Sequence, residues 1–123
     1  MRVVLKSKIH RAWVTDCNTD YIGSILIDED LMDKVDLWNF EKVLVCDVTN
    51  GSRFETYAIA GERGSGVCSV QGAAAHLSGR GHCLIIMSFE YTDVPVDPQM
   101  ILVDEDNRFV EHLEGAKHVQ PVH

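Results

Sequence analysis

Short apolar runs bounded by turn-forming residues recur along the chain, and this pattern limits the fold more than any other feature. Runs of this length are typical of many short β-strands and are too short for long helices. We expect strands over residues 3–5, 11–15, 24–27, 43–48, 54–60, 66–70, 84–92, 101–103 and 109–112. Strand spacings of about eight to twelve residues favour a small closed barrel over an open sheet, because closure removes exposed strand edges.

Turns and helices fit between these strands. Asn50-Gly51 predicts a strong hairpin turn, and Asp106-Asn107 predicts a weaker one. Helical signal is confined to Asp28–Lys34, which opens with acids suited to a helix N-terminus, and to Gly72–His76. We therefore expect a mainly β fold with short helices, while the sequence leaves the strand order open.

The length of 123 residues fits one domain spanning residues 1–123, with a frayed tail beyond Gly115. Nineteen acidic against eleven basic residues give a formal charge of −8. This charge argues against nucleic acid or an anionic membrane as a partner, since both bind positive surfaces. The N-terminus lacks the apolar region of a signal peptide, and no apolar run approaches the roughly 18 residues of a spanning helix. We therefore expect a cytoplasmic protein.

The positive charge is concentrated at the N-terminus, before the first acid, Asp16. It comes from Arg2, Lys6, Lys8, His10 and Arg11. A local positive field on the first strand is suited to an anionic small molecule. A solvated strand face without a ligand explains the same residues, and composition alone favours that explanation.

The cysteines and the C-terminal histidines do not form a recognisable metal-binding pattern. Cys17, Cys46, Cys68 and Cys83 are widely spaced without a C-x-x-C pair, which argues against zinc and indicates small core residues in a reducing compartment. His112, His118 and His123 are six and five residues apart. Because this spacing fits neither a helical nor a strand ligand pair, we expect surface histidines and no metal site.

The segment Tyr21-Ile22-Gly23-Ser24 carries the main functional signal, although a Gly-Ser pair alone occurs in ordinary turns. Its meaning comes from several separated motifs that stand in order around it. With them, the sequence from Met1 to Val110 resembles the pyruvoyl-dependent aspartate 1-decarboxylase family. The matching segments are Lys6-Ser-Lys-Ile-His-Arg11, Tyr21-Ile-Gly-Ser24, Ile27-Asp-Glu-Asp-Leu31, Thr49-Asn-Gly51, Arg53-Phe-Glu-Thr-Tyr-Ala58, Gly61-Glu-Arg-Gly64 and Gly72-Ala-Ala-Ala-His76.

The resemblance implies a double-psi β-barrel that assembles as a homotetramer with active sites at subunit interfaces. It implies conversion of L-aspartate to β-alanine and CO2 on the route to pantothenate. It also implies a proenzyme that cuts itself between Gly23 and Ser24, into a chain of residues 1–23 and a chain of residues 24–123 that begins with a pyruvoyl group. A maturation factor is a possible further partner.

The chemistry of the cut follows from the two residues at the junction. Gly23 permits strained backbone angles, so that the Ser24 hydroxyl can approach the Gly23 carbonyl for an N-to-O acyl shift. β-Elimination of the resulting ester and hydrolysis of the dehydroalanine then leave the pyruvoyl group. The resemblance places His10, Tyr21 and Thr56 around this event, with the Thr56 hydroxyl as a donor to the developing oxyanion. A half-buried strand pair explains His10 and Tyr21 equally well without the neighbouring motifs.

The pyruvoyl carbonyl is an electrophile that forms a Schiff base with the substrate amine and withdraws electrons during decarboxylation. Strand alternation puts Arg53, Glu55 and Tyr57 on one face, with Phe54 and Thr56 on the other. The planar fork of Arg53 suits a substrate carboxylate, and Tyr57 resembles the family's proton donor to the carbanion. Pattern alone favours a different interpretation, in which Arg53 pairs with Glu55 or Glu41 and Tyr57 is a packing residue.

Further candidates for substrate binding lie on the first strand and at the second helical segment. Lys8 and His10 share a face opposite Ile9 and Arg11, and Lys8 adds a second positive charge for a dicarboxylate. By resemblance, Thr56 also contacts substrate, as do the backbones of three small residues where a helix start favours an anion, although tight helix packing explains them too. These three residues are Gly72, Ala73 and Ala74.

The sequence departs from the family pattern at Gln71, where an Asn is usual. One extra methylene moves the amide by roughly 1.5 Å, enough to alter maturation or substrate preference. Ile22 and Cys46 also differ from some members, where Glu and Trp stand. Three hypotheses remain: decarboxylation of L-aspartate, the same reaction on a related acidic amino acid such as glutamate, and an unprocessed barrel that serves as a binding or scaffold protein.

Overall fold

The computed structural model describes residues 1–114, so the tail beyond Gly115 that was expected to fray lies outside them, as do His118 and His123. Strands dominate the described chain. In order, the elements are β1 (Arg2–Trp13), β2 (Asp16–Asn18), β3 (Ser24–Asp28), α1 (Glu29–Lys34), β4 (Lys42–Asp47), β5 (Arg53–Gly61), β6 (Cys68–Gln71), the 3-10 helix η1 (Gly72–Leu77), β7 (Cys83–Thr92), β8 (Gln99–Val103) and β9 (Phe109–Leu113).

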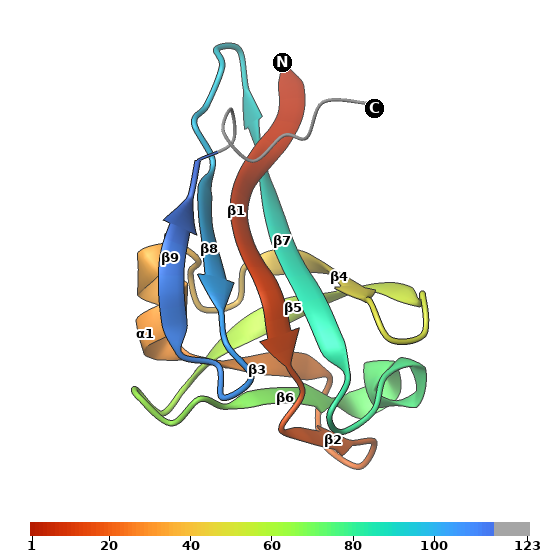
Figure 1. Ribbon diagram of the computed structural model, residues 1–123. Helices are drawn as coiled ribbons and strands as arrows, with labels where there is room; N and C mark the ends of the chain where they lie inside the picture. Colours follow the sequence, from red (N-terminus) through yellow and green to blue (C-terminus); the bar gives the residue numbers. More distant parts are fainter. Residues whose placement is uncertain (115–123) are drawn as a thin grey trace, which may run out of the picture.

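All nine strands hydrogen-bond into one sheet, in the order β2-β6-β3-β5-β4-β7-β1-β8-β9. In Figure 1 β1, β7, β8 and β9 stand upright, while β3, β5 and β6 run across the lower part of the molecule. The predicted mainly β fold with two short helices is confirmed, and the arrangement is consistent with a mainly β barrel fold. The hydrogen-bonded order does not close within residues 1–114, because β2 and β9 at its two ends do not pair.

The strand β1 is longer than the sequence pattern predicted. Two short strands, over residues 3–5 and 11–15, were expected, but one strand runs from Arg2 to Trp13. Between those two segments the basic residues alternate with Ser7 and Ile9, which are buried, so the segment continues as a half-buried strand. It lies between β7, its antiparallel partner, and β8, its parallel partner.

The core is built from the inward face of the sheet. In β4, Val43 and Val45 are buried while Leu44 and Cys46 are half-buried, the alternation expected when one face packs inside. Ile9 of β1 and Ile86 of β7 belong to the same cluster. Burying each such side chain contributes about 1.5–3 kcal/mol, so this face fixes the register of the strands that carry the site on their outer face.

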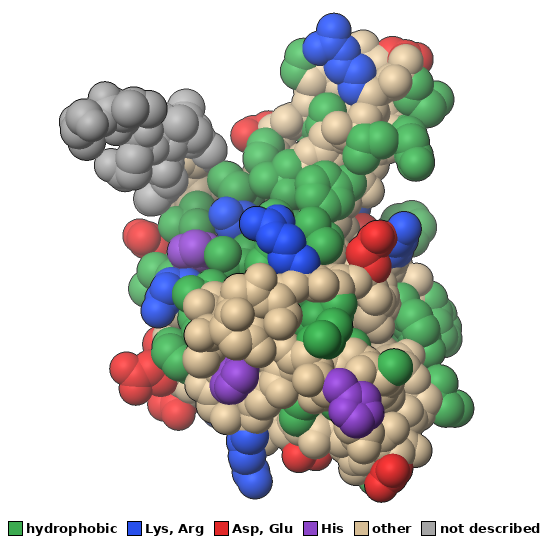
Figure 2. Space-filling view, turned by 90° about the vertical axis from the view of Figure 1, so that its right-hand side faces the viewer, with side chains coloured by type: hydrophobic (Ala, Val, Ile, Leu, Met, Phe, Trp, Pro, Cys, Tyr) green, Lys and Arg blue, Asp and Glu red, His purple; other side chains and the backbone are tan. Residues whose placement is uncertain are grey.

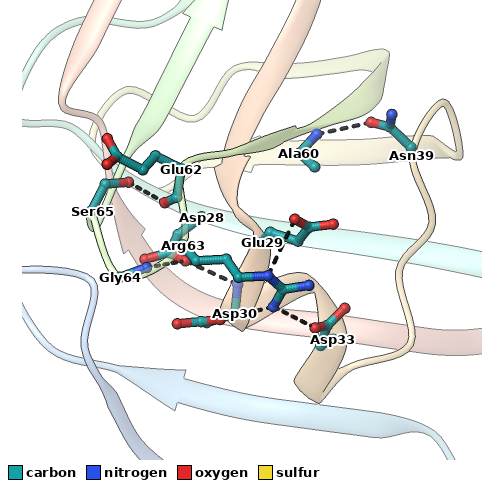
Figure 3. Close-up of polar contacts among 10 residues, drawn as sticks. All are labelled: Asp28, Glu29, Asp30, Asp33, Asn39, Ala60, Glu62, Arg63, Gly64 and Ser65. Carbon is teal, nitrogen blue, oxygen red and sulfur yellow. Dashed lines mark hydrogen bonds and ion pairs between the residues drawn. The ribbon is translucent and has the colours of Figure 1, made fainter.

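The short helix α1 is attached to the β5–β6 turn by charge and by a buried cap (Figure 3). Asp28 is 2% exposed, and its carboxylate accepts backbone hydrogen bonds from Asp30, Gly64 and Gly66 at 2.9, 3.1 and 2.9 Å. Arg63 reaches from the turn to Asp30 and Asp33. The predicted helix at Asp28–Lys34 is thus confirmed, with Asp28 as its N-cap.

The predicted turn at Asp106-Asn107 is confirmed between β8 and β9. Asn107 has a φ of 58° and is 1% exposed. Its side chain bonds both backbone polar groups of Trp13 and donates to the Gly66 carbonyl. The other predicted turn, at Asn50-Gly51, joins β4 to β5, and Gly51 has a φ of 79° there. Neither helix of the described chain is long and apolar enough to span a membrane.

Candidate active site

Ser24 and Tyr57 line the same open pocket, whose volume is about 460 Å³. Strand pairing brings them together: β3 runs parallel to β5 with Ile25 beside Ala58, which sets Ser24 beside Tyr57. Tyr57 alternates with the buried Ala58, so it faces outward into the pocket. The complete lining is Tyr21, Ile22, Ser24, Phe40, Tyr57, Ile59 and Gln71.

One polar contact between two lining residues of this pocket holds the Ser24 side chain. Ser24 is 4% exposed, and its Oγ donates a hydrogen bond to Oε1 of Gln71 at 3.2 Å. The contact follows from the antiparallel pairing of β3 with β6, in which Ser24 lies opposite Gln71. Gln71, the residue at which the sequence departs from the family pattern, therefore touches the predicted reactive hydroxyl.

Gly72 lies directly behind the predicted cut site. It has a φ of 78°, and a Cβ at this position would lie 2.4 Å from Gly23 Cα, 2.7 Å from Gly23 N and 3.0 Å from the Tyr21 carbonyl oxygen. Only glycine allows this close approach of two backbones. The strain expected at Gly23 itself is absent: Gly23 lacks a positive φ, and its added Cβ would meet Gln71 O at an ordinary 3.8 Å. The steric demand thus lies at Gly72 instead.

The predicted cationic residues lie on the outer face of the sheet, away from this pocket. Across β1, β7, β4 and β5, one row of paired residues runs His10, Ile85, Cys46 and Arg53. Three strand spacings separate its ends by about 14 Å, and Arg53 lies four residues, or about 13 Å, along β5 from Tyr57. Figure 2 shows Lys and Arg side chains beside hydrophobic ones across the middle of one side of the molecule.

Two of these cations are available to bind an anion. Within residues 1–114, Arg53 and Lys8 form no ion pair, whereas Glu55 pairs with Lys42 at 2.6 Å and Glu41 pairs with Lys6 at 3.2 Å. The alternative in which Arg53 is neutralised by Glu55 or Glu41 is therefore wrong. Lys6, in contrast, is held by Glu41 and by the Asp36 carbonyl, so it does not add to the free positive field.

His10 is half-buried on the same face, and its Nδ1 is buried without a hydrogen-bond partner among the described residues. Burial lowers the pKa of His10, and the charges of Lys8 and Arg11 lower it further, so the ring is neutral at pH 7. Arg11 was expected to point with Ile9, away from His10. Instead it occupies a bulge with a φ of 66°, and its guanidinium lies over the Trp13 ring.

Several other predicted residues lie outside the lining of the Ser24 pocket. Thr56 faces the opposite side of β5 from Tyr57 and is half-buried, while Phe54 on the same side is buried. Ala73 and Ala74 follow Gly72 in η1, the helical segment that the sequence predicted. One chain thus brings Tyr21, Ser24, Tyr57 and Gln71 together, and leaves Lys8, His10, Arg53, Thr56, Ala73 and Ala74 outside the pocket.

Comparison with known proteins decides the family. The aspartate decarboxylase family model matches residues 1–110. The chain belongs to the aspartate decarboxylase family. A protein of Acetivibrio thermocellus named aspartate 1-decarboxylase is 49% identical over 119 residues, covering 94% of each chain. One of Chromobacterium violaceum with the same name is 48% identical over 124 residues, covering 98% of each. The resemblance drawn from the motifs is confirmed over the span that it was expected to cover.

Aspartate decarboxylase motifs did not identify every residue of the pocket. Phe40 and Ile59 line it, yet no pattern in the sequence singled them out. Ile59 was recoverable in principle, because it lies two residues beyond Tyr57 and so shares its strand face. Phe40 precedes β4 in a loop whose path no local pattern predicts.

The cysteines behave as small core or half-buried residues. Cys68 and Cys83 are buried, and no disulfide joins any of the four thiols. Burial raises the pKa of the Cys68 thiol to about 12, with a smaller contribution from Cys17. Within residues 1–114, no three histidine, cysteine or acidic side chains gather closely enough to hold a metal ion.

Proposed function

We propose that this chain decarboxylates L-aspartate to β-alanine and CO2, on the route to pantothenate, after cutting itself between Gly23 and Ser24. The observation that carries the proposal is the meeting of Ser24 and Tyr57 in one pocket of an aspartate decarboxylase family member. Residues 1–23 and 24–123 would then be two chains of one domain. The reaction takes place in the cytoplasm, without nucleic acid or membrane as a partner.

The geometry around the junction supports the cut. Ser24 Oγ is the attacking atom, and its hydrogen bond to the Gln71 amide fixes its direction. Gly72 supports the Gly23 backbone from behind, which limits the movement of the carbonyl under attack. His10, Tyr21 and Thr56 complete the self-processing group that the family likeness implies, with Tyr21 the one that shares the Ser24 pocket.

The residues at position 24 and around it fit a pyruvoyl group. Ser24 is buried but lines an open pocket, so a chain beginning at residue 24 would present its first group to a small ligand. When present, that group supplies the electrophilic carbonyl and the electron sink that no ordinary side chain offers. Tyr57 lies in the same pocket with a hydroxyl suited to donating a proton to the substrate carbon that has lost CO2.

The residues that a single chain places in the Ser24 pocket are not sufficient to bind aspartate. Arg53 and Lys8, which form no ion pair within residues 1–114, are suited to the two carboxylates of aspartate. The backbones of Gly72, Ala73 and Ala74 and the Thr56 hydroxyl are further contacts. Arg53 is separated from Tyr57 by about 13 Å of strand, too far to serve one small substrate beside Ser24. We therefore infer a homotetramer in which a second copy presents its cationic face to this pocket.

An intact-mass spectrum after prolonged warm incubation tests the cut. We expect two chains, one ending at Gly23 and one beginning with a pyruvoyl group at position 24, and we expect Ser24→Ala to give one uncut chain without activity. A cut and active Ser24→Ala protein would overturn the mechanism. Cutting that begins only after addition of cell extract would identify a maturation factor, and a wild-type chain that remains uncut even then would instead indicate a binding or scaffold protein.

A substrate panel on the cut protein separates aspartate from related acids. Gln71 is the reason to include glutamate and substituted aspartates, since it departs from the family pattern and lines the pocket. We expect the highest kcat/KM for L-aspartate. A higher kcat/KM for glutamate would support the second hypothesis, in which the chain decarboxylates a related acidic amino acid.

Coexpression of two inactive variants tests whether two copies of the chain build each active site. Arg53→Ala and Tyr57→Phe each remove one side of it, and we expect each alone to be inactive. Coexpressed in equal amounts, they should regain activity in about one quarter of sites, because such a site takes one intact group from each copy. Two variants that remain inactive when coexpressed would show that each site is built by one chain.

A further inference from the structure

Phe40 has a backbone conformation that large side chains avoid. Its φ is 69°, in the left-handed region, where a Cβ collides with neighbouring backbone atoms. Its side chain is nevertheless 71% exposed in the single chain, so contacts within the chain bury too little of it to offset the strain. Strained residues persist where the surrounding structure holds them, and they gather at functional sites.

Contacts of its neighbours with β5 hold this loop in place. The Phe40 backbone N–H donates to the Ala58 carbonyl at 2.7 Å, and the Ala58 N–H donates to the Glu41 carbonyl at 2.9 Å. The Asn39 side chain accepts a hydrogen bond from the Ala60 N–H at 2.8 Å, as Figure 3 shows. These bonds fasten residues 39–41 to the stretch of β5 that follows Tyr57.

The fastened loop aims the Phe40 ring at Tyr57. The two ring centroids are 6.1 Å apart with an interplanar angle of 33°, a distance at which aromatic side chains attract each other. Both rings line the Ser24 pocket, together with the apolar Ile22 and Ile59. Phe40 therefore borders the one tyrosine whose hydroxyl the proposed reaction uses.

We propose that Phe40 is a positioning residue: its strained backbone holds its ring against Tyr57 and thereby keeps the Tyr57 hydroxyl directed at position 24. Phe40 acts through Tyr57 and takes no part in bond making or breaking. The inference rests on the proposed decarboxylation, because it assigns Phe40 to the protonation that Tyr57 performs.

Three variants of the full chain test the role. Phe40→Gly removes the ring and relieves the positive φ, so we expect a melting temperature no lower than that of wild type. Phe40→Tyr keeps an aromatic ring. Trp38→Ala is the matched control, since Trp38 lies in the same loop, is also 71% exposed and does not line the pocket. Each protein is brought to the cut form, and rates are expressed per cut chain by intact mass.

For Phe40→Gly we expect kcat with L-aspartate to fall about tenfold or more while KM changes less than about threefold, because the loss affects a group that acts after binding. Phe40→Tyr and Trp38→Ala should remain within about twofold of wild type in kcat. A Phe40→Gly enzyme with wild-type kcat, or an equal loss in Trp38→Ala, would overturn the proposal.

A second measurement does not depend on decarboxylation. With 3-fluorotyrosine placed at position 57, the fluorine spectrum reports the two orientations of the asymmetric ring. We expect one orientation to dominate in the wild-type background and in Phe40→Leu, which keeps bulk, and both to be populated in Phe40→Gly. Unchanged populations in Phe40→Gly would overturn the positioning role, whereas a cut wild-type protein without activity on aspartate would overturn the proposed function instead.

Discussion

The Ser24 hydroxyl donates its hydrogen bond to the Gln71 amide oxygen at 3.2 Å, and no stronger base contacts it within residues 1–114. An amide oxygen fixes the direction of a hydroxyl but does not remove its proton. The side chain that departs from the family pattern is thus the one that sets where Ser24 Oγ points. The length of the residue 71 side chain should therefore affect the rate of the proposed self-processing reaction.

Gln71→Ala should slow the cut by about fivefold and lower the unfolding free energy of the uncut chain by about 1–3 kcal/mol, since the buried Ser24 hydroxyl loses its partner. Gln71→Asn, with an amide withdrawn by roughly 1.5 Å, should fall between Ala and wild type. Intact mass over time gives the first quantity, and urea unfolding of the uncut wild-type and Gln71→Ala chains, both with Ser24 in place, checks the second. Cutting as fast in Gln71→Ala as in wild type would contradict the role of the amide.

Gly72→Ala should block the cut, because the added Cβ would lie 2.4 Å from Gly23 Cα and would force the Gly23 backbone to move. Gly51→Ala is the matched control: Gly51 has a φ of 79°, yet an added Cβ there meets nothing within 4 Å. Both substitutions carry the same left-handed penalty of about 1–2 kcal/mol, so only the contact with Gly23 distinguishes them. Normal cutting in Gly72→Ala, measured by intact mass, would show that the support behind Gly23 is dispensable.

Stability should depend on the protonation of His10. Its pKa is lowered in the folded chain by burial and by Lys8 and Arg11, so between that pKa and about 6.5 the unfolded chain binds more protons. The unfolding free energy should therefore be highest above about pH 6.5 and fall as the pH drops below it. His10→Gln lacks this contribution. Urea unfolding of uncut Ser24→Ala chains between pH 5 and 8 compares the two, and parallel pH profiles would contradict the expectation.

Asp28→Ala should destabilise the chain by about 3 kcal/mol, because three backbone N–H donors lose the buried carboxylate that accepts them. Asp28→Asn keeps one oxygen and should lose about half as much. Asp97→Ala, at an exposed position, serves as the control. Chemical unfolding of the three variants tests the order, and equal stability of Asp28→Ala and Asp97→Ala would show that the cap is unimportant.

Local patterns in the sequence predicted what depends on neighbours along the chain. Alternation correctly divided Tyr57 and Arg53 from Phe54, and turn chemistry located Gly51 and Asn107, because both depend on a few adjacent residues. In β1, alternation also placed Lys8 and His10 on one face, but the continuity of the strand from Arg2 to Trp13 was not predicted. The bulge at Arg11 broke an expected face, since a bulge depends on the partner strand.

Only those residues of the site that belong to the family-like motifs could be predicted from the sequence. The meeting of Ser24 with Tyr57 needs β3 and β5 to pair in parallel, and the contact with Gln71 needs β3 beside β6. Local sequence propensity does not predict either of these strand pairings. Phe40 was missed for the same reason, because its role follows from hydrogen bonds between its loop and a strand that comes later in the chain.

The position of β1 inside the sheet has a consequence for the protein once the bond after Gly23 is broken. The strand lies between β7 and β8, so the 23-residue peptide released by the proposed cut would stay embedded as a central strand with no covalent tether. Reassembly after denaturation then becomes a bimolecular event that depends on protein concentration, while the precursor refolds as a single chain. The uncut chain would unfold reversibly. After the cut, unfolding at low protein concentration would be effectively irreversible, because the two chains would have to find each other again.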